Sequence, residues 1–160
     1  DLMEDKVPLT RQLIDRYEKT HASTLAVMKV PHEEVNKYGV IDPAAETQPG
    51  LFDVKQFVEK PDVDKAPSDL AIIGRYLLTP EIFDMLETQK PGAGNEIQLT
   101  DALQTLATKE AIYAYNFEGQ RYDVGYKFGY LKTSIQFGLR HPEVRDELKE
   151  YIKELSKKIK

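Results

Sequence analysis

The chain has 160 residues and a hydrophobic content of 41%, which predicts one soluble domain large enough to bury a core. Its 22 basic and 27 acidic side chains give a net charge of -5 without a basic block, so general nucleic-acid binding is disfavoured. It has no cysteine, which excludes disulfides, thiolate zinc sites and cysteine nucleophiles and fits a reducing compartment.

No targeting or membrane segment is apparent in the sequence. No apolar run approaches the length of a membrane span and no signal peptide opens the chain, so we expect a cytoplasmic protein that does not enter membranes. The chain begins at Asp1-Leu2-Met3 and not at an initiator methionine. This start suggests a fragment or a processed product.

Two segments near the amino terminus predict half of a βαβ unit. The apolar residues of segment 6–21 recur at helical spacing, and Pro8 suits a first helical turn. Segment 23–30 is compact, apolar and β-branched, as a buried strand would be. The first strand of such a unit would then end at Asp1.

A hairpin is predicted next. Segment 38–41 indicates a short strand, segment 44–50 has the composition of a loop, and segment 51–58 alternates imperfectly between apolar and polar residues. We therefore expect a long hairpin with a bulge, which brings Gly39 close to Glu59.

The second half of the chain alternates strands and helices. The expected elements are a strand at 70–78, a short helix ending near 86, a helix at 99–109, a strand at 111–117, a helix with an apolar stripe at 128–139 and a last helix that begins at 141–143. This order predicts an α/β layer architecture with a mixed sheet flanked by helices.

The last helix carries an apolar seam between charged faces. The seam consists of Val144, Leu148, Ile152, Leu155 and Ile159. Paired charges on the other faces support such a helix only weakly, so the seam must pack on the domain or on a second subunit.

Glu59 and Lys60 form the first candidate site. A carboxylate accepts hydrogen bonds from hydroxyls and an ammonium binds phosphate, so the pair suits a sugar phosphate. Lys60 points to the opposite face from Glu59 if the strand continues, and it is swung round if the strand stops at Pro61. Taken alone, such a pair at a strand end is usually solvated surface charge.

Asp123 is the second candidate. An aspartate two places before a glycine, here Gly125, is most often a turn or cap residue, but it is also a hard oxygen ligand suited to magnesium. Asp1, Lys60 and Asp123 are each expected at or just beyond a strand end, where open α/β sheets bind ligands.

Other polar residues carry weaker signals. The three histidines, His21, His32 and His141, are scattered, which makes a histidine triad or zinc site improbable. Thr100 and Asp101 indicate first of all the amino terminus of a helix.

Five motifs occur in a fixed order along the chain. They are YGVIDP at 38–43, FVEKP at 57–61, APSDLAIIGRY at 66–76, GNEIQLTDA at 94–102 and RYDVG at 121–125. Together they closely resemble bacterial UTP-glucose-1-phosphate uridylyltransferases, a family of sugar nucleotidyltransferases. The resemblance covers essentially the whole chain and corresponds to the carboxyl-terminal half, or slightly more, of that family.

The resemblance implies the carboxyl-terminal part of a nucleotide-diphospho-sugar transferase fold, which is Rossmann-like. It also implies formation of UDP-glucose and pyrophosphate from UTP and glucose-1-phosphate with Mg²⁺ as cofactor. The family's glycine-rich loop for the UTP phosphates has no counterpart in this sequence, so we expect the chain to hold the sugar-phosphate side and to be inactive alone.

By similarity, Gly39 and Glu59 contact glucose hydroxyls and Lys60 contacts the phosphate. Asp123 is a magnesium ligand or lies just behind one, which makes Lys60 and Asp123 the expected catalytic residues. Asp1 resembles the second of two adjacent acidic residues of the family, so it is expected at the sugar, with metal binding a secondary role.

Two alternatives remain at this point. One is a non-catalytic fragment that serves as a folding or oligomerisation module through the apolar seam, and association into homo-oligomers is expected in either case. The other is a related nucleotidyltransferase with another nucleotide or sugar.

Overall fold

The computed structural model describes residues 2–4, 6–92 and 95–159, and its contacts divide the chain into two units. The sheet unit is Val7–Glu118, and the helical unit combines Asp1–Lys6 with Gly119–Lys160. Whether the two act as the single domain expected from chain length stays a prediction.

The predicted helices and strands are confirmed in their order, and the structure adds the short strands β1 and β7. The sheet unit contains α1 (Leu9–Thr20), β2 (Ser23–Lys29), the 3-10 turn η1 (His32–Lys37), β3 (Gly39–Gln48), β4 (Leu51–Glu59), the 3-10 turn η2 (Val63–Lys65), β5 (Leu70–Leu77), α2 (Ile82–Thr88), α3 (Leu99–Leu106) and β6 (Ile112–Asn116). The helical unit contains β1 (Leu2–Glu4), β7 (Gln120–Tyr122), α4 (Lys127–Gly138) and α5 (Arg145–Lys158).

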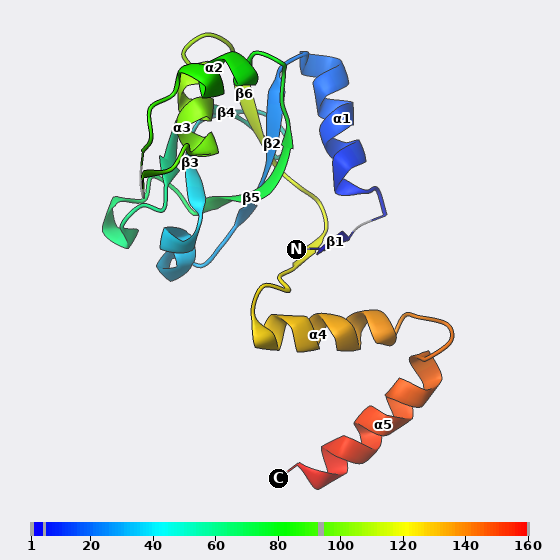
Figure 1. The fold of residues 1–160 in the computed structure, drawn as a ribbon. Coiled ribbons are helices and arrows are strands. Elements are labelled where there is room, and N and C mark those ends of the chain that lie inside the picture. The colour runs from blue at the N-terminus through cyan, green and yellow to red at the C-terminus, as the bar shows by residue number, and fades with distance from the viewer. Residues whose placement is uncertain (1, 5, 93–94, 160) are drawn as a thin grey trace. The chain divides into compact units, whose positions relative to one another are not determined.

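The sheet of the sheet unit is mixed, as predicted. Its strand order is β2-β5-β3-β4-β6. β2 runs parallel to β6, and the other neighbours are antiparallel. Helix α1 packs against β2 and β5, and α3 packs against β4 and α2, so helices flank the sheet (Figure 1).

The sheet closes on itself, whereas an open sheet was expected. The β3–β4 hairpin makes the closure, because Val40 pairs with Ala71 of β5 and the first residues of β4 pair with β6. Three register shifts interrupt the hairpin. Such bulges bend and twist a strand pair, which allows one hairpin to reach both neighbours.

The prediction of a loop at 44–50 is wrong, because β3 continues to Gln48. Pairing with β4 overrides the turn-rich composition of this segment. Pro43 lies at a register shift, where the N–H that proline lacks disturbs the ladder least. The predicted hairpin bulge is confirmed at the same place.

The main core lies between the sheet and helices α2 and α3. It consists of Leu25, Val27, Ile41, Phe57, Ile72, Ile82, Met85, Ala102, Leu103, Leu106, Ile112 and Ala114. The amphipathic pattern of α3 places its apolar side chains in this core and leaves the polar residues of its first turns at the edge of the sheet.

The helical unit begins with a strand that was not expected. A strand was expected to end at Asp1, but the described chain continues as strand β1 over Leu2–Glu4, which pairs antiparallel with β7. Asp1 lies outside the described residues. None of the described helices is long and apolar enough to cross a membrane.

Candidate active site

The β3–β4 hairpin brings the first candidate residues together. Gly39 and Glu59 are direct partners in the ladder, which confirms the predicted proximity. The Lys60 N–H donates to the Tyr38 carbonyl oxygen at 3.0 Å, one residue beyond that pair. The site therefore lies where the two arms of the hairpin end.

The Glu59 carboxylate is half-buried and held by a helix. Its Oε2 accepts a hydrogen bond of 2.6 Å from Thr100 Oγ1, and Thr100 is buried in the first turn of α3. That length is typical of a hydroxyl bound to a carboxylate. Oε1 accepts no hydrogen bond from the residues that the structure describes, which leaves it available to a ligand hydroxyl.

Tyr76 is the electrostatic neighbour of this carboxylate. Burial raises the pKa of the Tyr76 hydroxyl above its ordinary value of 10.0, and the negative charge of Glu59 raises it further. Both effects disfavour a phenolate here. Tyr76 therefore stays a neutral hydroxyl beside Glu59 at physiological pH.

Gly39 leaves room that a side chain would fill. A Cβ on Gly39 would lie 3.1 Å from Glu59 Oε2, 3.2 Å from Ile72 Cδ1 and 3.4 Å from Thr100 Oγ1. Glycine thus keeps the carboxylate and its hydroxyl partner close to the backbone of β3.

Lys60 follows the last residue of β4 and is exposed. Its φ is +43°, in the left-handed region, so the strand stops and the residue is swung round. Of the two orientations left open by the sequence, the structure shows the second. The ammonium makes no ion pair or hydrogen bond to any described residue, so its charge is available to an anion.

Asp123 follows the last residue of β7 in the helical unit. Its Oδ1 accepts the Gly125 N–H at 2.8 Å and its Oδ2 accepts from Arg121 at 3.3 Å. The first contact is a turn of the kind typical for aspartate before glycine, so the structural role of Asp123 is confirmed. Whether it also binds a metal stays a prediction.

The described residues contain no group of three or more histidine, aspartate or glutamate side chains that could hold a metal. Magnesium often takes only one or two carboxylates, together with substrate phosphates. The single carboxylate of Asp123 fits that requirement as one ligand. The other acidic candidate, Asp1, lies outside the described residues.

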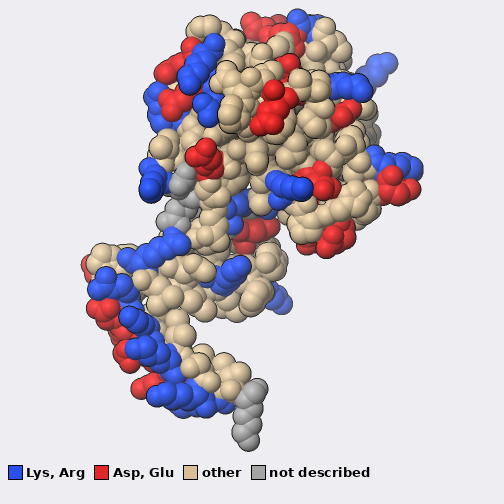
Figure 2. Space-filling model, turned by 180° about the vertical axis from the view of Figure 1, so that it is seen from behind, with Lys and Arg blue, Asp and Glu red and all other residues tan. Residues whose placement is uncertain are grey.

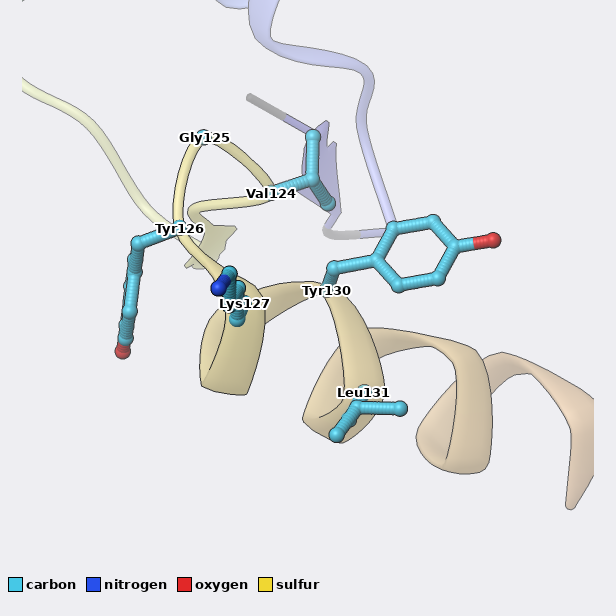
Figure 3. A pocket seen from close by; sticks show the side chains of 6 residues that line it. All are labelled: Val124, Gly125, Tyr126, Lys127, Tyr130 and Leu131. Atoms are coloured by element: carbon cyan, nitrogen blue, oxygen red, sulfur yellow. The ribbon is translucent and has the colours of Figure 1, made fainter.

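An open hollow of about 460 Å³ lies directly after Asp123, at the start of α4. Its lining consists of Val124, Gly125, Tyr126, Lys127, Tyr130 and Leu131. In Figure 3, Tyr126 and Tyr130 point away from each other on either side of the loop that enters α4. The apolar stripe predicted at 128–139 is partly exposed, with Phe128 67% and Leu131 57% exposed.

Charged side chains of both signs are interspersed over the surface seen in Figure 2. Helix α5 carries alternating lysine and glutamate residues, such as the bonded pair Lys153 and Glu150. Lys60 is therefore one cation among many, and its candidacy depends on its place beside Glu59.

The structure thus unites Gly39, Glu59 and Lys60, whereas Asp123 belongs to the other unit and its role beside them stays a prediction. Sequence reasoning missed Thr100, which was interpreted only as a helix terminus, and Tyr76. No local pattern links either residue to Glu59, because both contacts depend on tertiary packing.

Comparison with known proteins identifies relatives of the chain. Residues 3–137 match the family model described as Nucleotidyl transferase. The chain is 61% identical, over 99% of its length and 54% of the relative, to a UTP-glucose-1-phosphate uridylyltransferase of Streptococcus pneumoniae serotype 4. It is also 61% identical, over 95% of its length and 51% of the relative, to a UTP-glucose-1-phosphate uridylyltransferase 2 of Streptococcus pyogenes serotype M3.

Solved structures give the same picture. A UDP-glucose pyrophosphorylase complexed with UDP-glucose matches 88% of this chain and 53% of its own with a TM-score of 0.82 and 44% identity. A UTP-bound enzyme from Acinetobacter baumannii matches 96% of this chain and 53% of its own with a TM-score of 0.83 and 37% identity. The chain spans about half the length of the relatives it matches.

Proposed function

Because the chain belongs to the nucleotidyl transferase family, we propose that it forms the sugar-phosphate-binding part of an enzyme that makes UDP-glucose and pyrophosphate from UTP and glucose-1-phosphate. The observation that carries the proposal is the end of the β3–β4 hairpin, where Glu59 faces Gly39 and Lys60 follows. A carboxylate beside an ammonium matches the two ends of glucose-1-phosphate. The relatives' names, and the structure with UDP-glucose, support this substrate class.

On the sugar side, Glu59 accepts hydrogen bonds from glucose hydroxyls through its available oxygen Oε1. Gly39 lets the sugar approach the backbone of β3, because no side chain stands between them. Asp1 makes a further sugar contact in this proposal, on the ground of its resemblance alone.

On the phosphate side, Lys60 acts as a point charge for the glucose-1-phosphate oxygens. One of these oxygens attacks the α-phosphorus of UTP in line, a new P–O bond forms, and the bond to the leaving pyrophosphate breaks. No protein nucleophile takes part. The residues therefore act by positioning two anions and reducing their repulsion.

Asp123 would hold the magnesium ion in this proposal. The ion would supply positive charge that neutralises the phosphates of both substrates. The fixed orientation of Asp123, through Arg121 and Gly125, suits a carboxylate that has to present a lone pair in one direction.

Self-association is part of the proposal. The described part of the helical unit exposes large apolar side chains on both helices, among them Phe128, Leu131, Tyr151 and Leu155. Exposed apolar surface of this kind is typical of interaction sites. The cytoplasmic location expected from the sequence stays a prediction.

Calorimetry of the 160-residue chain tests the substrate assignment. The ligands are glucose-1-phosphate, UDP-glucose and UTP, each with and without magnesium. We expect glucose-1-phosphate to bind and UTP not to bind, because the residues assigned here contact the sugar and its phosphate. A chain that bound none of the sugar compounds would contradict the proposal and favour a purely associative role.

Two variants divide the site into its halves. Lys60→Ala should weaken binding of glucose-1-phosphate and inorganic phosphate by about tenfold or more, because a charge-assisted contact is lost. Glu59→Gln should weaken binding of the sugar phosphate but not of inorganic phosphate. Lys55→Ala is the matched control, since Lys55 lies on the same strand and pairs with Asp42. Equal losses in Lys60→Ala and the control would remove Lys60 from the site.

A further inference from the structure

Helix α3 contacts the end of β4 at two points. Thr100 Oγ1 donates to Glu59 Oε2 at 2.6 Å, and Gln104 Oε1 accepts the Phe57 N–H at 2.8 Å. Thr100 and Gln104 are one helical turn apart on one face of α3, and Phe57 and Glu59 are two residues apart on β4. The rise between the helix residues, about 6 Å, nearly equals the rise between the strand residues, about 7 Å.

We propose that Thr100 is a positioning residue: together with Gln104 it clamps the end of β4 to α3, holds the Glu59 side chain in one orientation and thereby directs Oε1 toward the sugar hydroxyls. This inference rests on the proposed function of Glu59. It explains which contact orients the Glu59 carboxylate, namely the hydrogen bond from Thr100.

The hydrogen bond from Thr100 to Glu59 has one direction. A hydroxyl has a single proton, and here it is given to one named oxygen of the carboxylate, so the other oxygen is the one left for a ligand. Thr100 is the second residue of α3. No helical carbonyl precedes it by one turn, so the usual competing acceptor for a helical threonine hydroxyl does not arise.

Thr100 lies in confined surroundings. Thr100 is 8% exposed, and the space beside it is bounded by Gly39 and Ile72. The half-buried Glu59 carboxylate loses a hydrogen-bond donor when the Thr100 hydroxyl is removed, and its side chain then turns to find another partner. The clamp prevents this turn.

Gln104 contacts the backbone of β4. It satisfies a strand N–H two residues before Glu59 and so fixes the distance between helix and strand. The helix therefore positions both the backbone and the side chain of the segment that leads into Lys60.

The test compares four variants of the chain. Thr100→Val keeps the shape of the side chain and removes the donor, whereas Thr100→Ser keeps the donor. Thr105→Val is the matched control, because Thr105 is exposed on the same helix and its hydroxyl donates to the Asp101 carbonyl oxygen and not to Glu59. Gln104→Met removes the second point of the clamp and serves as an independent variant if Thr100→Val does not fold.

Two readouts are measured. Side-chain carbon couplings of Glu59 by NMR, without ligand, should show one rotamer in the wild type, Thr100→Ser and Thr105→Val, and averaging in Thr100→Val. Calorimetry should show roughly tenfold weaker binding of glucose-1-phosphate to Thr100→Val, with inorganic phosphate unchanged and Thr100→Ser close to wild type. Gln104→Met should change both readouts in the same direction.

A Glu59 rotamer that is unchanged in Thr100→Val, or unchanged sugar-phosphate binding in that variant, would overturn the clamp while leaving the proposed function intact. A wild-type chain that does not bind glucose-1-phosphate would instead overturn the sugar role of Glu59, and the NMR readout would still judge the positioning by Thr100. Equal loss of sugar-phosphate and inorganic-phosphate binding would mean a general structural defect and would also overturn the clamp.

Discussion

The charge of Glu59, at the end of β4, contributes to the raised pKa of the neighbouring Tyr76 hydroxyl on β5. The Tyr76 hydroxyl is largely withdrawn from water, which is the main reason its pKa is raised. The carboxylate adds a second increase, since two negative charges would repel each other. The pair therefore allows the charge of Glu59 to be detected through a tyrosine.

Glu59→Gln should lower the pKa of Tyr76 without returning it to 10.0, because burial, the larger cause, remains. Titration of ring-labelled tyrosine by NMR measures this change. Tyr113 lies on β6, the strand that runs parallel to β2, and serves as an internal reference in the same spectra. A Tyr76 pKa that did not move would mean that the two side chains do not interact.

The same raised pKa links Tyr76 to folding stability at high pH. The unfolded chain loses the Tyr76 proton near 10.0, and the folded chain loses it at higher pH. The contribution to stability is therefore complete below pH 10 and is lost as the pH rises through the folded pKa. In Glu59→Gln this loss should end at a lower pH.

The start of α4 is closely packed around Gly129. A Cβ on Gly129 would overlap the Asp123 carbonyl oxygen and approach the Tyr126 ring at 2.6 Å. A Cβ on Gly138, at the other end of the helix, would meet only the end of the Leu148 side chain at 2.6 Å. The backbone of Asp123 cannot move aside easily, whereas the flexible end of the Leu148 side chain can.

Gly129→Ala should therefore destabilise the helical unit by about 1–3 kcal/mol through overpacking and should displace Asp123. Gly138→Ala should be close to neutral, because the better helix propensity of alanine, about 1 kcal/mol, offsets a small shift of Leu148. Urea unfolding followed by circular dichroism measures both. If the two variants were equally stable, the close packing of Gly129 on Asp123 would be contradicted.

Helices and strands were predicted well where the apolar pattern is local, and less well where pairing with another strand determines the structure. The apolar spacing of α1 and the continuous apolar run of β2 were sufficient to identify both. Segment 44–50 has loop composition, yet most of it is strand because β4 pairs with it. Composition indicates only the local conformational preference of the segment. The backbone hydrogen bonds between β3 and β4 outweigh that preference here.

In the helical unit, helix α5 exposes part of its apolar seam. Helix α5 has no buried residue, although its seam has the period of a packed helix. Leu155 is 40% exposed and Ile159 is 68% exposed. Within the helical unit, this seam therefore has apolar surface left to bury.

Replacing Leu155 and Ile159 together by lysine should shift the chain from an associated form to a monomer, because charge on the seam opposes burial. Light scattering coupled to size exclusion measures the mass. Ser156→Lys is the matched control, since Ser156 is exposed on the same helix and lies outside the seam. A wild-type chain that is monomeric at all concentrations would contradict the proposed self-association.

The chain's own pattern was enough to establish an α/β fold, the long hairpin and the approach of Gly39 to Glu59, because side-chain period and hairpin pairing depend on neighbours in the sequence. Three features depended on tertiary contacts: the closure of the sheet, the hydrogen bond from Thr100 to Glu59, and the exposure of the α5 seam. Each joins or separates residues far apart in the chain, and no local periodicity records which distant surfaces meet.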